Sequence, residues 1–305
     1  MCIRDRGYIV GQENRGLEYM FIMMNAARYG VGVQGIAVAE RAYQKAVTFA
    51  RERVQSRPVD GSASAGASII YHPDVRRMLM TMRAYVEGCR ALSSVAASAY
   101  DAAHNHPDAD VRKVNQTFYE FMVPLVKGYS TEMSLEVTSL GIQVHGGMGY
   151  IEETGAAQYY RDAKILTIYE GTTAIQSNDL VGRKTLRDGG QNAKGIASQI
   201  EATEAELRKN GSANAVAVAQ RLQAAREAFL DVVNFMASTA NPNAIYAGSV
   251  PYLMLAGNLM AGWQMARALL VAQQQLAAGV DAAFMQAKIT TARFYACLLY
   301  TSRCV

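Results

Sequence analysis

The sequence predicts an all-α protein, and its composition and its apolar pattern both support this fold class. Half of the 305 residues are hydrophobic, 18% are charged and six are proline. Apolar residues recur at helical spacing along most of the chain, whereas alternating β-branched runs are few. A chain of this length can bury a core without metals or disulfides. We therefore expect helices that pack mainly on other helices or on a second subunit.

The first long periodic stretch predicts one helix from Leu17 to about Arg53. Three glycines inside it lower helix propensity but would let another backbone or a ligand approach closely. The stretch "SRPVDGSASAGAS", residues 56–68, then breaks the period with Pro, Gly and Ser. It predicts an exposed loop.

A second helix is predicted to begin at Pro73, since Pro73 and Asp74 both suit a helix N-terminus. Its expected buried stripe consists of Val75, Met78, Leu79, Met82, Val86, Cys89 and Leu92. A third helix should run from about Val111 to Leu140, with a bend at Pro124. The polar stretch "HNHPDAD" between these helices imitates a set of metal ligands, but a solvated turn explains it, so no metal site is predicted.

The later part of the chain predicts further helices. In "GIQVHGGMGYIEETG" the glycines permit unusual backbone angles and close approach. Helices follow at about 154–169 and 173–186, and after "RDGGQNAKG" the composition becomes rich in Ala and Gln. The expected helices of this last part are roughly 195–210, 213–239, 250–279 and 281–296.

The change of composition near residue 190 predicts a domain boundary. We expect a helical bundle over 8–190 and a helical extension over 191–296. The segments 1–7 and 297–305 have no capping or amphipathic pattern that fits their neighbours, so both are interpreted as non-native or residual sequence.

Charge, cysteine and hydropathy patterns exclude several classes of function. The net charge of +4 is spread along the chain, so no nucleic-acid surface is indicated. The four cysteines lack CxxC spacing and suit a reducing compartment. The run "VPYLMLAGNLMAGW" reaches polar residues before it is long enough to span a membrane. A cytoplasmic protein without a membrane span is the expectation.

The stretch "AKILTIYEGTTAIQ", residues 163–176, carries one acidic residue, Glu170, directly before a glycine. A helix that stops at Gly171 explains this pattern without any function. Alternatively, desolvation would raise the pKa of the Glu170 carboxyl and make it a general base. The apolar and aromatic residues expected to surround it are Tyr159, Tyr160, Ile165, Leu166, Ile168 and Tyr169. The neighbouring charges, Arg161, Asp162 and Lys164, are interpreted as structural ion pairs.

Two motifs in this region resemble the C-terminal helical domain of the acyl-CoA dehydrogenases, flavoenzymes that make trans-2-enoyl-CoA thioesters. The motifs are "LEVTSLGIQVHGGMGYIEE" and "YYRDAKILTIYEGTTAIQ", and the likeness extends over about residues 8–188. The loop after Arg57 and the helices after residue 190 resemble the long-form subgroup that includes 3-methylmercaptopropionyl-CoA dehydrogenases. The resemblance implies an up-down helical bundle followed by a helical extension domain, with FAD as cofactor and an acyl-CoA as substrate.

The resemblance also implies roles for residues near the substrate. Glu170 matches the catalytic base that removes the α-proton while the β-hydride passes to the flavin. Gly171 would let the thioester lie against the backbone. Arg28 matches an arginine near the CoA end of the acyl pocket, although an exposed helix arginine is the plainer reading, and Asn25 stands where many relatives carry aspartate.

A second set of residues matches FAD contacts of the family, some of them reaching a neighbouring subunit. The set is Arg53, Gln55, His72, Gln143, Gly146, Gly147 and Thr172. A guanidinium such as that of Arg53 suits pyrophosphate recognition. His72 could instead cap the second helix, and Thr172 could start the helix that follows the base.

The resemblance covers only the C-terminal part of the family's enzymes, so the chain is expected to be a fragment with little activity by itself. The intact protein should form a homodimer or homotetramer and pass electrons to an electron-transfer flavoprotein. An acyl-CoA oxidase, whose flavin reacts with oxygen, is the nearest alternative. A non-catalytic helical scaffold that binds protein or DNA is a further alternative, against which the presence of Glu170 argues. Acyl chain length and branching are not determined by this part of the sequence.

Overall fold

The structure is a computed structural model that describes residues 7–62 and 66–301. All repeating secondary structure in these ranges is helical, and the one β-bridge there joins Val54 to Ser68. The all-α prediction is therefore confirmed. The segments expected to be non-native, 1–7 and 297–305, fall partly outside the described residues. Cys2 and Cys304 both lie outside them.

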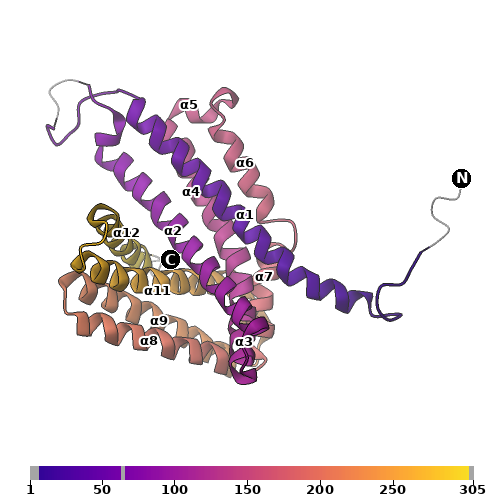
Figure 1. Ribbon diagram of the computed structural model, residues 1–305. Coiled ribbons are helices and arrows are strands. Elements are labelled where there is room, and N and C mark those ends of the chain that lie inside the picture. The colour runs from indigo at the N-terminus through magenta and orange to yellow at the C-terminus, as the bar shows by residue number, and fades with distance from the viewer. Residues whose placement is uncertain (1–6, 63–65, 302–305) are drawn as a thin grey trace, which may run out of the picture.

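Helix α1, Gly16–Glu52, runs along the whole first bundle and confirms the long helix expected there. It packs on α2 (Pro73–Asn105), α4 (Ser130–His145) and α6 (Ala156–Leu166). Gly32 allows α1 to approach the segment 125–129 closely, because a Cβ there would lie 2.3 Å from the carbonyl oxygen of Val126. The first turns of α1 extend beyond the other helices (Figure 1).

Helix α2 begins at Pro73 as expected, and six of the seven residues of its expected stripe are buried, Val75 being half-buried. The short turn η1, Ile69–Tyr71, precedes it. Helix α3, Ala109–Pro124, begins after Asp108, whose carboxylate accepts hydrogen bonds from the backbone N–H groups of the first turn. The "HNHPDAD" stretch is therefore a capped turn.

Pro124 ends α3, and the chain continues as a π-helical segment, η2 (Leu125–Tyr129), directly into α4. The predicted third helix is thus interrupted rather than bent, because the proline ring removes one backbone donor at this point. It also ends at His145, beyond the expected Leu140.

After α4 come α5 (Gly147–Tyr150), the short turn η3 (Glu152–Thr154) and α6. Helix α6 ends at Leu166, earlier than predicted, and the loop 167–172 follows. The backbone N–H of Thr173 donates to the carbonyl of Thr167 and closes this loop at 3.1 Å. The next elements are α7, Thr173–Asp179, and the π-helical η4, Leu180–Leu186.

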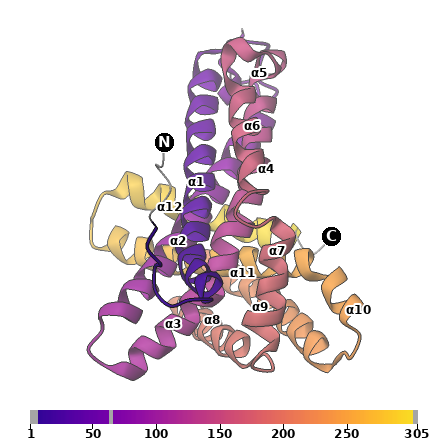
Figure 2. The ribbon, with the colours of Figure 1, turned by 90° about the vertical axis from the view of Figure 1, so that its right-hand side faces the viewer.

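The helices after residue 190 gather around one end of the first bundle (Figure 2). They are α8 (Gln191–Asn210), α9 (Ala213–Ser238), α10 (Pro242–Ala247), α11 (Ser249–Ala277) and α12 (Ala282–Thr301). The short α10, which follows the capping residue Asn241, was not predicted. Helix α12 reaches Thr301, beyond its expected end at residue 296.

Helix α11 joins the extension to the first bundle by packing on α2, α7 and η2. The hydroxyl of Tyr129 in η2 lies 2.8 Å from Asn258 Oδ1 and 2.9 Å from the hydroxyl of Tyr295. A Cβ on Gly257 would lie 2.2 Å from the Tyr129 ring, so only glycine permits this contact. One hydrophobic core thus includes residues from both sides of residue 190.

Within the described ranges, no helix is both long and apolar enough to cross a bilayer. No three His, Cys, Asp or Glu side chains of these ranges come together in a way that could hold a metal ion.

Candidate functional site

The site residues expected from the sequence lie in two groups, one beside the middle of α1 and one at its C-terminal end. We call Asn25, Arg28, Glu170, Gly171 and Thr172 the base group. The glycine-end group is made of Arg53, Gln55, His72, Gln143, Gly146 and Gly147. Arg28 and Arg53 are 25 residues apart in the sequence, so ~37 Å of helix separates these two residues.

Glu170 sits on a strained turn of the loop after α6. Its φ is 57°, a left-handed backbone angle that is uncommon for a residue with a side chain, and Gly171 follows with a φ of 92°. Such angles cost on the order of 1 kcal/mol or more and occur often at functional sites. A Cβ at Gly171 would also lie 2.7 Å from Gln176 Nε2, so the turn requires glycine there.

The expectation that apolar side chains enclose Glu170 is wrong for the described chain. Ile165 is 52% exposed and Ile168 is 49% exposed, and Tyr160 and Tyr169 are exposed as well. Tyr160 and Ile165 lie on the exposed face of α6, and Ile168 and Tyr169 lie beyond the end of that helix at Leu166. Glu170 itself is half-buried.

Polar groups from neighbouring elements hold the Glu170 turn. Lys127 in η2 is completely buried, and its Nζ donates to the carbonyl oxygen of Gly171 at 2.6 Å. Gln176 in α7 is also buried, and its Nε2 lies 3.3 Å from the same oxygen and 3.4 Å from the carbonyl of Glu170. The hydroxyl of Thr173 donates to the Glu132 carboxylate.

Burial lowers the pKa of the Lys127 amine from its usual 10.5 to about 8. Glu132 and Glu170 oppose this change in pKa, and Arg28 adds to it. Lys127 and Gln176 were not identified from the sequence. The available signal was a single lysine within the apolar stretch "FMVPLVKGY".

Thr172 occupies the N-cap position of α7, where its hydroxyl accepts a hydrogen bond from the backbone N–H of Ile175 at 3.4 Å. The expectation that Thr172 starts this helix is confirmed. Its side chain is exposed beside the Glu170 turn.

Arg28 is buried to 6% exposure, so the reading as an exposed helix arginine is wrong. Its guanidinium forms an ion pair with Asp179 at 3.5 Å, and Arg183 approaches the other oxygen of Asp179 at 3.4 Å. Arg28 Nε has no hydrogen-bond partner among the described residues. Asn25, nearly one turn earlier on α1, is half-buried.

All members of the glycine-end group except His72 line a pocket of about 450 Å³ between the end of α1, the end of α4 and α5. Arg53 and Gln55 are exposed at its edge, and Arg53 Nη2 donates to Gln55 Oε1 at 3.4 Å. His72 stands at the N-cap position of α2, but its side chain makes no capping hydrogen bond there. Instead, its Nε2 lies 2.8 Å from the carbonyl oxygen of Gln55 and ties the two segments together.

Bare backbone forms one side of this pocket. Gly146 has φ 60° and ψ −143°, angles that essentially only glycine adopts, and a Cβ at Gly146 or Gly147 would meet no atom within 4 Å. His145 also lines the pocket, and its ring stacks on that of Phe49 with the centroids 4.4 Å apart. Burial lowers the pKa of His145. The pocket therefore combines an uncharged floor with one exposed guanidinium.

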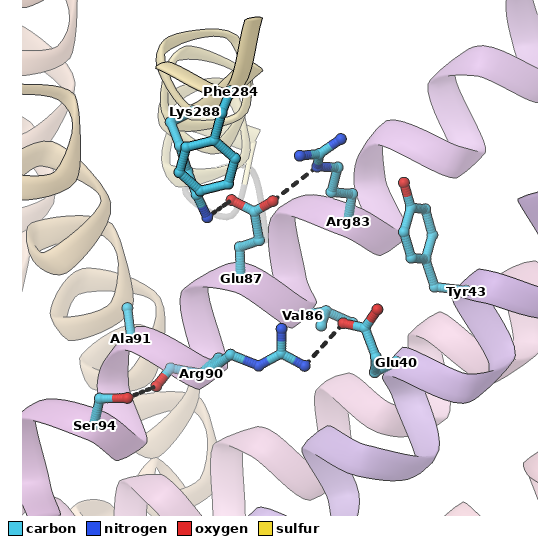
Figure 3. A pocket seen from close by; sticks show the side chains of 10 residues that line it. All are labelled: Glu40, Tyr43, Arg83, Val86, Glu87, Arg90, Ala91, Ser94, Phe284 and Lys288. Atoms are coloured by element: carbon cyan, nitrogen blue, oxygen red, sulfur yellow. Dashed lines mark hydrogen bonds and ion pairs between the residues drawn. The ribbon is translucent and has the colours of Figure 1, made fainter. Parts of the chain in front are cut away.

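A separate pocket of about 430 Å³ lies between α1, α2 and α12 (Figure 3). The carboxylate of Glu87 bonds Arg83 at 2.7 Å and Lys288 at 2.9 Å, and Glu40 bonds Arg90 at 2.9 Å. Both carboxylates of the pocket are thus paired with basic side chains. They connect α12 to α2 and contact neither group of site residues.

Comparisons with known proteins identify the family of the chain. The family description "Acyl-CoA dehydrogenase, C-terminal domain" matches residues 14–184, and "Acetyl-CoA dehydrogenase C-terminal like" matches residues 196–299. A 3-methylmercaptopropionyl-CoA dehydrogenase of Ruegeria pomeroyi is 59% identical over 95% of this chain and 49% of its own length. A broad-specificity linear acyl-CoA dehydrogenase of Mycobacterium tuberculosis is 34% identical over 95% of this chain and 50% of its own length.

Among solved structures, an acyl-CoA dehydrogenase of Bacillus anthracis complexed with FAD shares the fold, with a TM-score of 0.74 and 19% identity. The likeness covers 96% of this chain and 49% of that one. The chain thus spans about half the length of the relatives it matches. It belongs to the acyl-CoA dehydrogenase family of FAD-dependent oxidoreductases and corresponds to their C-terminal part.

Proposed function

We propose that this chain provides the C-terminal half of an enzyme that oxidises an acyl-CoA to a trans-2-enoyl-CoA with Glu170 as the catalytic base. The observation that carries the proposal is the Glu170–Gly171 turn. It presents a half-buried carboxylate on a strained backbone, held by two buried polar side chains. A stop signal at the end of a helix requires none of these features.

The base group suits removal of a proton from carbon. An α-C–H beside a thioester is weakly acidic, so the carboxylate must be held in place against it. Gly171 leaves no side chain between the turn and a thioester. Arg28 Nε is a buried donor without a hydrogen-bond partner in the described part of the chain, and we assign this group, with Asn25, to the substrate's polar end.

We assign FAD to both groups. The cofactor, when bound, supplies the acceptor for the β-hydride. The glycine-end group fits the nucleotide end of FAD, because a planar ring can lie against Gly146 and Gly147 and the exposed guanidinium of Arg53 can bond a phosphate. Thr172 lies beside the Glu170 turn and suits the flavin end.

Arg28, at the substrate end of the base group, lies ~37 Å from Arg53 along α1, which is longer than one extended FAD molecule. We therefore infer that the two groups of one chain serve two different active sites. The enzyme would then be a homodimer or homotetramer in which each FAD bridges subunits. Loss of Arg53 should accordingly weaken both FAD retention and subunit association.

The substrate proposal follows the relative at 59% identity. We propose a short acyl-CoA of the 3-methylmercaptopropionyl type, with electrons leaving to an electron-transfer flavoprotein. Measuring oxygen consumption distinguishes an electron-transfer flavoprotein from oxygen as the electron acceptor. An acyl-CoA oxidase would form peroxide in step with enoyl-CoA, whereas the proposed dehydrogenase forms little.

Anaerobic flavin bleaching by 3-methylmercaptopropionyl-CoA tests the proposal in the full reading frame that contains this chain. Glu170→Gln should keep FAD but bleach at least roughly 10²–10⁴-fold more slowly, the usual contribution of a general base. Glu153→Gln, which changes an exposed carboxylate in η3, is the matched control and should bleach normally. Bleaching of Glu170→Gln near the wild-type rate would show that the base lies elsewhere.

A further inference from the structure

Lys127 is an unusual residue at its position. Its side chain is completely buried in η2, and among the described residues its Nζ has one hydrogen bond, to the carbonyl oxygen of Gly171. A buried amine is costly, and a neutral backbone carbonyl alone repays little of that cost. The same carbonyl already has a second donor in Gln176 Nε2. The stability of the fold therefore does not explain Lys127.

Several features of the surrounding fold nevertheless fix the contact between Lys127 and Gly171. Lys127 lies in a π-helical segment, a geometry often found at functional sites. Gly128 beside it allows α7 to approach, since a Cβ there would lie 3.1 Å from Gln176 Cβ and 2.9 Å from Leu253. Tyr129 anchors the far side of η2 to α11 through Asn258.

We propose that Lys127 is a positioning residue for Glu170: by fixing the carbonyl of Gly171 it keeps the turn in the left-handed conformation that aims the carboxylate at the substrate. This inference rests on the proposed role of Glu170 as the base. Fixing that carbonyl restricts rotation of the peptide between Gly171 and Thr172, and Gln176 restricts the peptide between Glu170 and Gly171. Glu170 then cannot relax to an ordinary backbone angle.

Lys127 also lies close enough to Glu170 for electrostatic attraction, and burial favours the neutral amine. Glu132 and Arg28 are the other charged groups that face it.

The test is Lys127→Met in the FAD-loaded, full-length protein, because methionine has a similar length and no donor. Lys184→Met is the matched control: Lys184 is a largely buried lysine in the other π-helical segment and bonds Glu120 at 3.0 Å, away from the Glu170 turn. Each variant is mixed anaerobically with 3-methylmercaptopropionyl-CoA, with and without deuterium at the α-carbon. Flavin content and the Kd of the thioester are measured in parallel.

We expect Lys127→Met to keep its flavin and to bind the thioester within about twofold of the wild type, but to bleach on the order of 10–100-fold more slowly, as a base displaced by about 1 Å does. Its α-deuterium isotope effect should increase, because proton removal becomes the slow step. Lys184→Met should match the wild type in all four measurements.

Three results would overturn the inference: bleaching of Lys127→Met within twofold of the wild type, loss of flavin or of thioester binding together with rate, or failure of Lys127→Met to fold. The last two would show a general structural role. Glu170→Gln in the same assay distinguishes a failure of the proposed function from a failure of the proposed role of Lys127. If Glu170→Gln bleaches normally, the proposed function is wrong, and if it is inactive while Lys127→Met is normal, only the role of Lys127 is wrong.

Discussion

Replacing Lys127 by methionine should stabilise the protein at neutral pH even though it slows catalysis. The pKa of this amine is lowered from 10.5 to about 8 in the folded state by burial. Between these two values the unfolded chain binds more protons than the folded one, so wild-type stability rises with pH across that window. Below pH 8 the folded protein carries the full cost of a buried charge.

The magnitude follows from this difference in pKa. The cost of protonating Lys127 is about 3 kcal/mol at pH 7 and about 1 kcal/mol at pH 9.5. Methionine removes this cost and loses one hydrogen bond to the Gly171 carbonyl, worth about 1 kcal/mol. Lys127→Met should therefore be about 2 kcal/mol more stable than the wild type at pH 7 and about equally stable at pH 9.5.

Urea unfolding of the full-length wild type and of Lys127→Met at both pH values measures this difference. Lys184→Met is again the control, since Lys184 is paired with Glu120, and it should show no gain. A variant that is less stable than the wild type at pH 7, or a difference that does not change with pH, would refute the reasoning. Higher stability with lower activity is the combination that an ordinary packing residue does not produce.

Other contacts give further predictions. Arg226→Met should lower the free energy of unfolding by about 3–5 kcal/mol, because it leaves the buried Glu204 carboxylate without its two hydrogen bonds at 2.7 and 3.0 Å. In urea unfolding, the double variant Arg226→Met/Glu204→Met should recover stability, and no recovery would contradict a buried pair. Gly257→Ala should cost about 1–3 kcal/mol by clashing with Tyr129, and an unchanged Tm would refute that contact. Arg53→Ala should lose FAD and dissociate on gel filtration, whereas unchanged flavin content would argue against a phosphate contact.

Local sequence patterns were enough to predict most of the helices. The 3.6-residue spacing of apolar side chains located α1, and Pro73 with Asp74 located the start of α2. Thr172 was expected to begin a helix because a hydroxyl there can accept a backbone N–H, and it does. These features depend on residues within a few positions of one another.

Features that depend on distant residues were missed. Pro124 signalled a disturbance, but the π-helical geometry of η2 depends on how α1 and α11 pack against it. The contact from Lys127 to Gly171 joins residues 44 positions apart, and no local pattern reveals it. The surroundings of Glu170 were wrong because the sequence shows neither that Tyr160 and Ile165 lie on the exposed face of α6 nor that this helix ends at Leu166.

The glycine-rich stretch was understood only in part. The sequence indicated that glycine is needed in this stretch either for its backbone angles or for close packing, and the structure shows which of the two applies at each position. Gly149 is required by packing, since a Cβ would lie 2.3 Å from the carbonyl of Ile142, and Gly146 by its backbone angles. Gly147 meets neither constraint, and open space beside it is the feature that suits a ligand.

A crystal structure of the full-length protein with FAD and bound 3-methylmercaptopropionyl-CoA tests the central claim most directly. We predict a Glu170 carboxylate oxygen within roughly 3.5 Å of the thioester's α-carbon, the separation of reacting atoms in a productive complex. The adenine of that FAD should lie beside Gly146 and Gly147 of another subunit. A Glu170 side chain directed away from the α-carbon, or an adenine held by the same chain, would contradict the account.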